Sequence, residues 1–81
     1  MRITLKLFAQ LKDVTGRNEV AIDLQEDATI AELREAIKRQ IPELGEFMAS
    51  ISFAVDDEYV GADKRLAPDT TVALIPPISG G

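Results

Sequence analysis

The residues of this sequence best suited to chemistry are its last six, Pro76-Pro77-Ile78-Ser79-Gly80-Gly81. Two consecutive prolines cannot donate hydrogen bonds to a sheet and favour polyproline II, so we expect an extended tail that leaves the domain at Pro76. Six residues reach at most ~20 Å, at about 3.3–3.6 Å each, which is enough to thread a pocket of a partner protein. Because Gly80 and Gly81 lack side chains, the terminal carboxylate can enter a channel too narrow for a Cβ atom.

A terminal carboxylate reacts once another enzyme has activated it. Joined to AMP as an acyl adenylate in that enzyme's ATP site, it becomes an electrophile. It can then accept sulfur to form a thiocarboxylate, or an amine to form an isopeptide bond. A glycine pair at a chain end arises by chance in roughly 0.5% of proteins at ~7% Gly per position. We therefore interpret Gly80 and Gly81 as functional, with Gly81 as the covalent site.

The sequence contains no cysteine and no histidine. This excludes disulfides, metal sites built from thiolate or imidazole ligands, and catalysis by Cys or His. We expect no metal site, and we expect the chain not to catalyse a reaction alone. The missing nucleophiles and bases should lie on its partners.

Fourteen acidic residues against nine basic ones give the chain a net charge of −5. Nucleic acids and anionic membranes need clustered Lys and Arg on their partners, so this balance argues against both. It favours a basic protein partner instead. No apolar run approaches the roughly 18 residues of a membrane span, and the N-terminal residues do not form a signal peptide, so we expect a cytoplasmic protein.

Short segments with alternating or β-branched residues predict strands in five places. Residues 2–8 and 19–24 alternate with period two, which is typical of strands with one buried face. Between them, Leu11 and Val14 have the spacing of a short helical turn. Residues 71–75 are largely apolar, which favours a central strand buried on both faces. The predicted strands are residues 2–8, 19–24, 51–55, 58–60 and 71–75.

The clearest helix signal begins at Thr29. Thr29 and Glu32 have the spacing of a capping box, in which each side chain accepts from the other residue's backbone N–H. Pro42 ends this helix, and Glu35 and Arg39 have the spacing of an i, i+4 ion pair on its solvent side. The apolar residues that recur on one face of the helix are Ile30, Leu33 and Ile37.

The order strand, strand, helix, strand, strand, strand predicts an α+β fold, the ubiquitin-like β-grasp, with one main helix packed across a mixed sheet. Residues 1–75 should form this domain and residues 76–81 its extended tail. The first and last strands should lie parallel at the sheet centre. The residues that we assign to the core are Ile3, Leu5, Leu7, Val20, Ile22, Leu33, Ile37, Phe53, Val55 and Leu66.

Four blocks of sequence carry a resemblance to a known family. The chain resembles the small subunit of molybdopterin synthase, the MoaD family of sulfur carriers, over essentially its full length. The last block is the most specific. The four blocks are Leu7-Phe8-Ala9-Gln10-Leu11, Thr29-Ile30-Ala31-Glu32-Leu33, Ala54-Val55 with Glu58-Tyr59-Val60, and Val72-Ala73-Leu74-Ile75-Pro76-Pro77-Ile78-Ser79-Gly80-Gly81.

The resemblance implies a defined reaction cycle. An activating enzyme adenylates Gly81 with MgATP, and a sulfurtransferase provides the sulfur of a C-terminal thiocarboxylate. The tail then enters the large catalytic subunit of molybdopterin synthase, which contributes the catalytic side chains. There it donates sulfur to cyclic pyranopterin monophosphate, which forms the dithiolene of molybdopterin. The carrier itself binds no cofactor stably.

The resemblance also implies roles for individual residues. Phe8, Tyr59 and Ile75 match family positions that form a hydrophobic surface for both partners, although ordinary core packing is a close rival for each. Phe8 lies on the otherwise polar side of its strand, and an exposed aromatic residue favours an interface. The residues that would line the threaded segment are Pro76, Pro77, Ile78 and Ser79, with Ile78 as an apolar anchor.

Two other functions use the same tail. The chain could carry sulfur for another product, such as the thiazole of thiamine, or it could be a ubiquitin-like modifier joined to lysines. Its resting state also stays open between a free chain, a heterotetramer with the large subunit and a complex with the activating enzyme.

Overall fold

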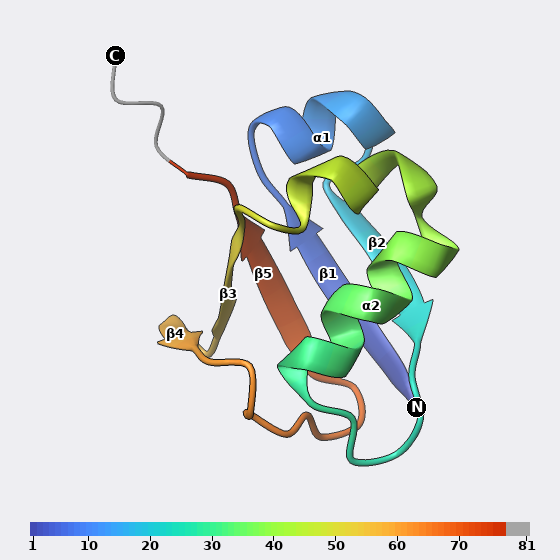
Figure 1. Cartoon of the computed structure of the whole chain (residues 1–81), viewed down its shortest axis with the longest axis vertical. Helices are drawn as coiled ribbons and strands as arrows, with labels where there is room; N and C mark the ends of the chain where they lie inside the picture. The colour runs from blue at the N-terminus through green and yellow to red at the C-terminus, as the bar shows by residue number, and fades with distance from the viewer. Residues whose placement is uncertain (78–81) are drawn as a thin grey trace.

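The computed structural model describes residues 1–77, which form a five-stranded sheet with its longest helix packed across one face and a short helix beyond the end of the first strand (Figure 1). Its elements follow the predicted order. The strands are β1 (Arg2–Leu7), β2 (Glu19–Asp23), β3 (Ser52–Val55), β4 (Glu58–Val60) and β5 (Thr71–Ile75). The helices are α1 (Gln10–Thr15), α2 (Ile30–Gln40) and the 3₁₀ helix η1 (Pro42–Phe47).

The strands are arranged in the order β2-β1-β5-β3-β4. The first and last strands, β1 and β5, are parallel neighbours at the centre, with Leu5 opposite Val72 and Leu7 opposite Leu74. The other neighbouring pairs are antiparallel. The β-grasp prediction and the predicted central pair are therefore confirmed.

The start of α2 has the predicted capping box. Thr29 Oγ1 accepts from the Glu32 backbone N–H at 3.3 Å, and Glu32 Oε1 accepts from the Thr29 backbone N–H at 2.9 Å. The predicted ion pair between Glu35 and Arg39 is wrong, because Glu35 Oε2 instead lies 3.0 Å from Lys38 Nζ, one residue earlier on the helix.

The core lies between α2 and the sheet, and η1 closes one end of it. Leu44 and Met48 are fully buried, although no element is predicted between the end of the helix at Pro42 and the strand at residues 51–55. Leu66 is 3% exposed, as predicted for a core residue from a loop. Val20 and Val55 are only half-buried at the edge of the core. The largest fully buried side chains are Ile3, Leu5, Leu11, Ile30, Leu33, Ile37, Leu44, Met48, Val72 and Leu74.

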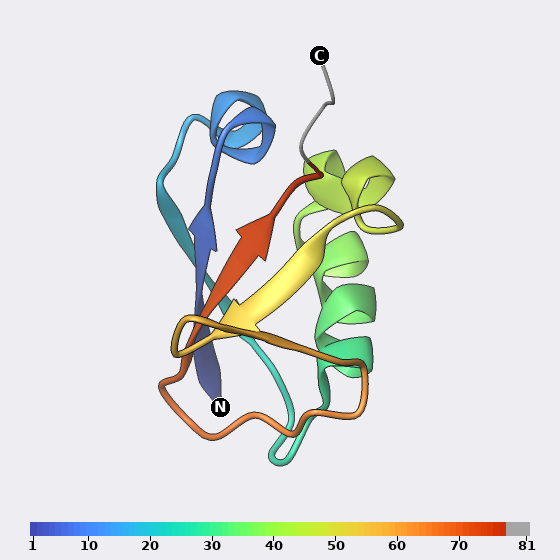
Figure 2. The ribbon, with the colours of Figure 1, turned by 90° about the vertical axis from the view of Figure 1, so that its left-hand side faces the viewer.

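One face of the sheet carries no helix (Figure 2). The prediction that β5 is buried on both faces is therefore wrong. Val72 and Leu74 point into the core and are fully buried, whereas Ala73 and Ile75 on the other face are half-buried. The bare side of the sheet is called the open face below.

Candidate functional site

The three residues predicted to contact partners lie around one hollow on the open face. Phe8 is 45% exposed and Tyr59 is 71% exposed, while Ile75 is half-buried. The hollow has a volume of about 490 Å³ and is called the sheet-face hollow below. Its lining residues are Lys6, Phe8, Ala54, Asp56, Asp57, Tyr59, Thr71, Ala73 and Ile75.

The register of four strands builds the floor of the sheet-face hollow. Lys6 lies opposite Ala73, Ala73 lies opposite Ala54, and Ala54 lies opposite Tyr59. These four residues form one row across β1, β5, β3 and β4. Because the two central members are alanines, the row is low in the middle and is bordered by the long side chains of Lys6 and Tyr59.

Phe8 directly follows β1 and keeps its ring outside the core. The next residue, Ala9, has φ 49° and ψ −120°, a positive-φ conformation that L-residues rarely adopt and that turns the chain sharply into α1. Leu11 in α1 is fully buried, whereas Val14 on the same helix is 44% exposed. The predicted helical turn is therefore confirmed, but only Leu11 of the two residues used to predict it joins the core.

The residues around the sheet-face hollow offer charged and apolar groups for binding. Two carboxylates come from Asp56 and Asp57, in the turn between β3 and β4, and one ammonium group comes from Lys6. Within residues 1–77, no group of three or more acidic residues is arranged to hold a metal ion. The hollow is suited to contact with the surface of another protein.

The tail begins at the edge of this site. β5 ends at Ile75, and the chain continues through Pro76, which is half-buried, to Pro77, which is exposed. Ile75 lines the hollow, so the first residues of the tail leave the sheet beside it. The remaining residues of the predicted site, Ile78, Ser79, Gly80 and Gly81, lie outside the described residues.

Comparison with known proteins identifies the family. Residues 5–81 match the family model described as the ThiS family. The chain belongs to the ThiS family. A molybdopterin synthase sulfur carrier subunit from Chlamydomonas reinhardtii is 37% identical, with 100% of both chains covered. One from Caenorhabditis elegans is 35% identical, with 98% of this chain and 96% of the relative covered. The predicted resemblance to these carriers is confirmed.

This ThiS-family chain also resembles a second kind of protein, for which a structure has been solved. The crystal structure of SAMP1 from Haloferax volcanii has a TM-score of 0.83 and 30% sequence identity, with 100% of both chains covered. A relative from the same organism, named small archaeal modifier protein 1, is 32% identical, with 94% of this chain and 97% of the relative covered.

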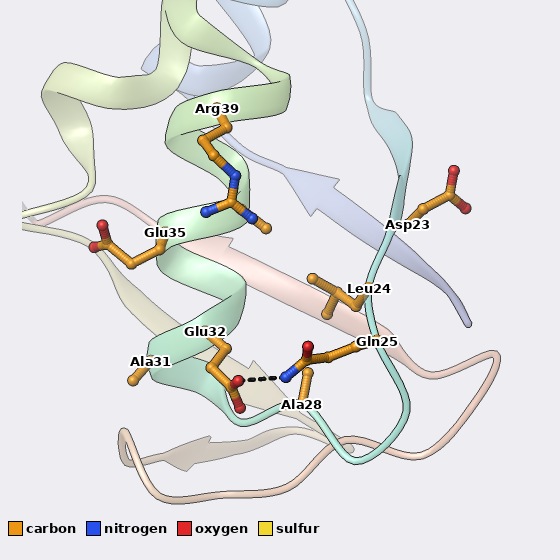
Figure 3. A pocket seen from close by; sticks show the side chains of 9 residues that line it. Asp23, Leu24, Gln25, Ala28, Ala31, Glu32, Glu35 and Arg39 are labelled. Atoms are coloured by element: carbon orange, nitrogen blue, oxygen red, sulfur yellow. Dashed lines mark hydrogen bonds between the residues drawn. The ribbon is translucent and has the colours of Figure 1, made fainter.

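The ThiS-family domain has a second hollow, of about 350 Å³, between α2 and the segment after β2 (Figure 3). Two of the three acidic side chains that line it, Glu32 and Glu35, already have partners within the domain. Gln25 Nε2 donates to Glu32 Oε2 at 2.6 Å, and Glu32 also completes the capping box. Glu35 pairs with Lys38. We therefore interpret this hollow as part of the packing between α2 and the segment after β2, and not as the functional site.

Within residues 1–77, no helix is both long and apolar enough to span a bilayer.

Proposed function

We propose that this chain is the sulfur carrier subunit of a molybdopterin synthase. The observation that carries the proposal is the position of the tail, which leaves β5 beside the exposed ring of Tyr59 and the exposed ring of Phe8. A partner that covers these rings is then placed to receive the Gly-Gly end. The names of the algal and nematode relatives support the same function.

The proposed reaction takes place at the carboxylate of Gly81. An activating enzyme joins this carboxylate to AMP from MgATP, with release of pyrophosphate. A sulfurtransferase then provides the sulfur that displaces AMP, and the product is a C-terminal thiocarboxylate. We expect this cycle in the cytoplasm, with no cofactor held stably by the carrier.

Sulfur transfer then takes place in the large subunit of the synthase. The chain supplies a docking surface and a donor terminus, and the large subunit supplies the catalytic side chains. Pro76 and Pro77 keep the tail extended, Ile78 anchors it, and Gly80 allows it into a narrow channel. The acceptor is cyclic pyranopterin monophosphate, and two donations build the molybdopterin dithiolene.

The likeness to the archaeal modifier favours a second candidate function. SAMP1 is named a modifier protein, and it matches this chain over its whole length. A modifier uses the same activated carboxylate, but the group that displaces AMP and becomes joined to Gly81 is a lysine amine in place of a sulfur atom. The two functions therefore share the tail and differ in the group that becomes joined to Gly81.

Removal of Gly81 tests the proposed chemistry. The variant that lacks Gly81 and a variant with a C-terminal extension should fail to restore molybdenum cofactor formation in a strain without its own carrier. The wild-type chain from active cells should show one oxygen replaced by sulfur in its intact mass. Cofactor formation without Gly81 would contradict the proposal, whereas isopeptide adducts at Gly81 would support the modifier.

A further inference from the structure

The sheet-face hollow carries charges that the domain itself does not pair. Lys6 projects from β1, and the turn with Asp56 and Asp57 lies on the far side of β5, at the end of β3. No ion pair or side-chain hydrogen bond joins any of these three residues to another residue within 1–77. All three are exposed. The hollow therefore has a positive side and a negative side that are both available to a partner.

The negative side is held by a two-residue turn. Val55 pairs with Glu58, so Asp56 and Asp57 form the whole connection between β3 and β4. Their φ angles are 52° and 65°, and such hairpin turns favour Asn and Gly. Asp tolerates this conformation and adds a carboxylate at each position. The short connection fixes both charges close to the strands that line the hollow.

The floor between the charged sides is apolar and low. Ala73 and Ala54 are neighbours in the row that runs from Lys6 to Tyr59. A partner side chain can fill the space above the two alanines, where it displaces water and contacts Tyr59 and Phe8. Such a contact gives affinity in any orientation of the partner, whereas charges at its border select one orientation.

Resting on the proposed function, we infer that the large subunit docks with a basic side chain against Asp56 and Asp57, an acidic one against Lys6, and an apolar one on the alanine floor. The reversed orientation would place like charges together on both sides of the hollow and is disfavoured. The charges thereby set the direction in which the partner receives the tail that follows Ile75.

The test neutralises the negative side without changing the shape of the turn. The double variant D56N/D57N keeps residues that tolerate a positive φ. The matched control, E43Q/E46Q, removes the same charge from η1, on the helical side of the sheet (Figure 2). Binding to the large subunit of molybdopterin synthase from the source organism is measured by calorimetry at low and at high salt.

We expect D56N/D57N to bind the large subunit roughly 3- to 30-fold more weakly than wild type at low salt, because two exposed charge contacts are lost. The difference should vanish near 1 M salt, where the Debye length falls to about 3 Å. K6E should also weaken binding at low salt. The control E43Q/E46Q should stay within about twofold of wild type.

Three results would overturn the inference. The first two leave the proposed function intact, whereas the third overturns both. If D56N/D57N and its control E43Q/E46Q lose the same affinity for the large subunit, only the net charge of the chain matters. Wild-type self-association that D56N/D57N abolishes would make the open face an interface between two copies of this chain. A wild-type chain that fails to bind the large subunit at any salt would overturn the proposed function, and the inference with it.

Discussion

The side chain of Gln40, at the end of α2, covers the outer edge of the sheet by hydrogen bonding to the backbone of Asp23 in β2. Its Nε2 donates to the Asp23 carbonyl oxygen at 2.9 Å, and its Oε1 accepts from the Asp23 backbone N–H at 3.4 Å. β2 is an edge strand, so these two groups would otherwise face solvent. Because an uncovered edge is a template for pairing with another chain, the last residue of α2 also protects the domain against self-association.

The first prediction is that Gln40→Ala destabilises the domain and exposes this edge. We expect the free energy of unfolding to fall by about 1–2 kcal/mol, because two exposed hydrogen bonds are lost. Urea unfolding measures the stability, and sedimentation velocity measures association. Gln10→Ala is the control, because the Gln10 side chain makes no hydrogen bond within residues 1–77. Equal losses for the two variants would contradict the role of Gln40.

The second prediction concerns the capping box of α2. Thr29→Ala should lower the free energy of unfolding by about 1 kcal/mol, because the Glu32 backbone N–H loses its acceptor. Glu32→Gln keeps an acceptor for the Thr29 backbone N–H, so it should cost less than Glu32→Ala. Urea unfolding of the four chains checks the order. Equal stability of the Gln and Ala variants at position 32 would show that the reciprocal bond contributes nothing.

The third prediction is that Arg34 stabilises the junction between α2 and β3. Its guanidinium lies 5.1 Å from the ring centroid of Phe53, and its Nη1 donates to the Met48 carbonyl oxygen. Arg34→Ala should cost about 2 kcal/mol in the free energy of unfolding, since both contacts are lost at a half-buried position.

Lys38→Ala is the matched control for Arg34, because it removes a cation from the same helix. Its ion pair with Glu35 is exposed on both sides, with side chains 45% and 60% accessible, so the loss should stay below about 0.5 kcal/mol. A loss for Lys38→Ala as large as that for Arg34→Ala would contradict the contact with Phe53 and Met48.

Local patterns predicted most elements of the fold. The strand signals depend on alternation, and the start of α2 depends on Thr29 and Glu32, so a short window of sequence is enough for each. The 3₁₀ helix η1 has three residues per turn and is only six residues long, so it gives no sustained period. The burial of Leu44 and Met48 follows from the way this helix closes the core, which no local pattern shows.

The candidate site was predictable only in part. Phe8 was an aromatic residue on the polar side of a strand, and that anomaly correctly indicated exposure. Ala54 and Ala73 gave no signal, because their role depends on the pairing of β3 with β5, which are far apart in the sequence. Lys6 showed only that its side of β1 is polar. The hollow therefore emerges from the register of the sheet.

The fourth prediction is that Tyr59 contributes to partner binding and little to stability. Tyr59→Thr removes a ring that is 71% exposed and keeps a residue that favours strands. We expect the affinity for the large subunit of molybdopterin synthase to fall at least about tenfold, as for aromatic residues at the centre of interfaces. The free energy of unfolding should change by no more than about 0.5 kcal/mol.

Val14→Ala is the control for this prediction, because Val14 is also an exposed apolar residue but does not line the sheet-face hollow. It should leave the affinity for the large subunit unchanged. Calorimetry gives the affinities and urea unfolding gives the stabilities. If Tyr59→Thr binds as tightly as Val14→Ala, the partner does not cover the hollow, and the docking role of the open face is wrong even if the tail still carries sulfur.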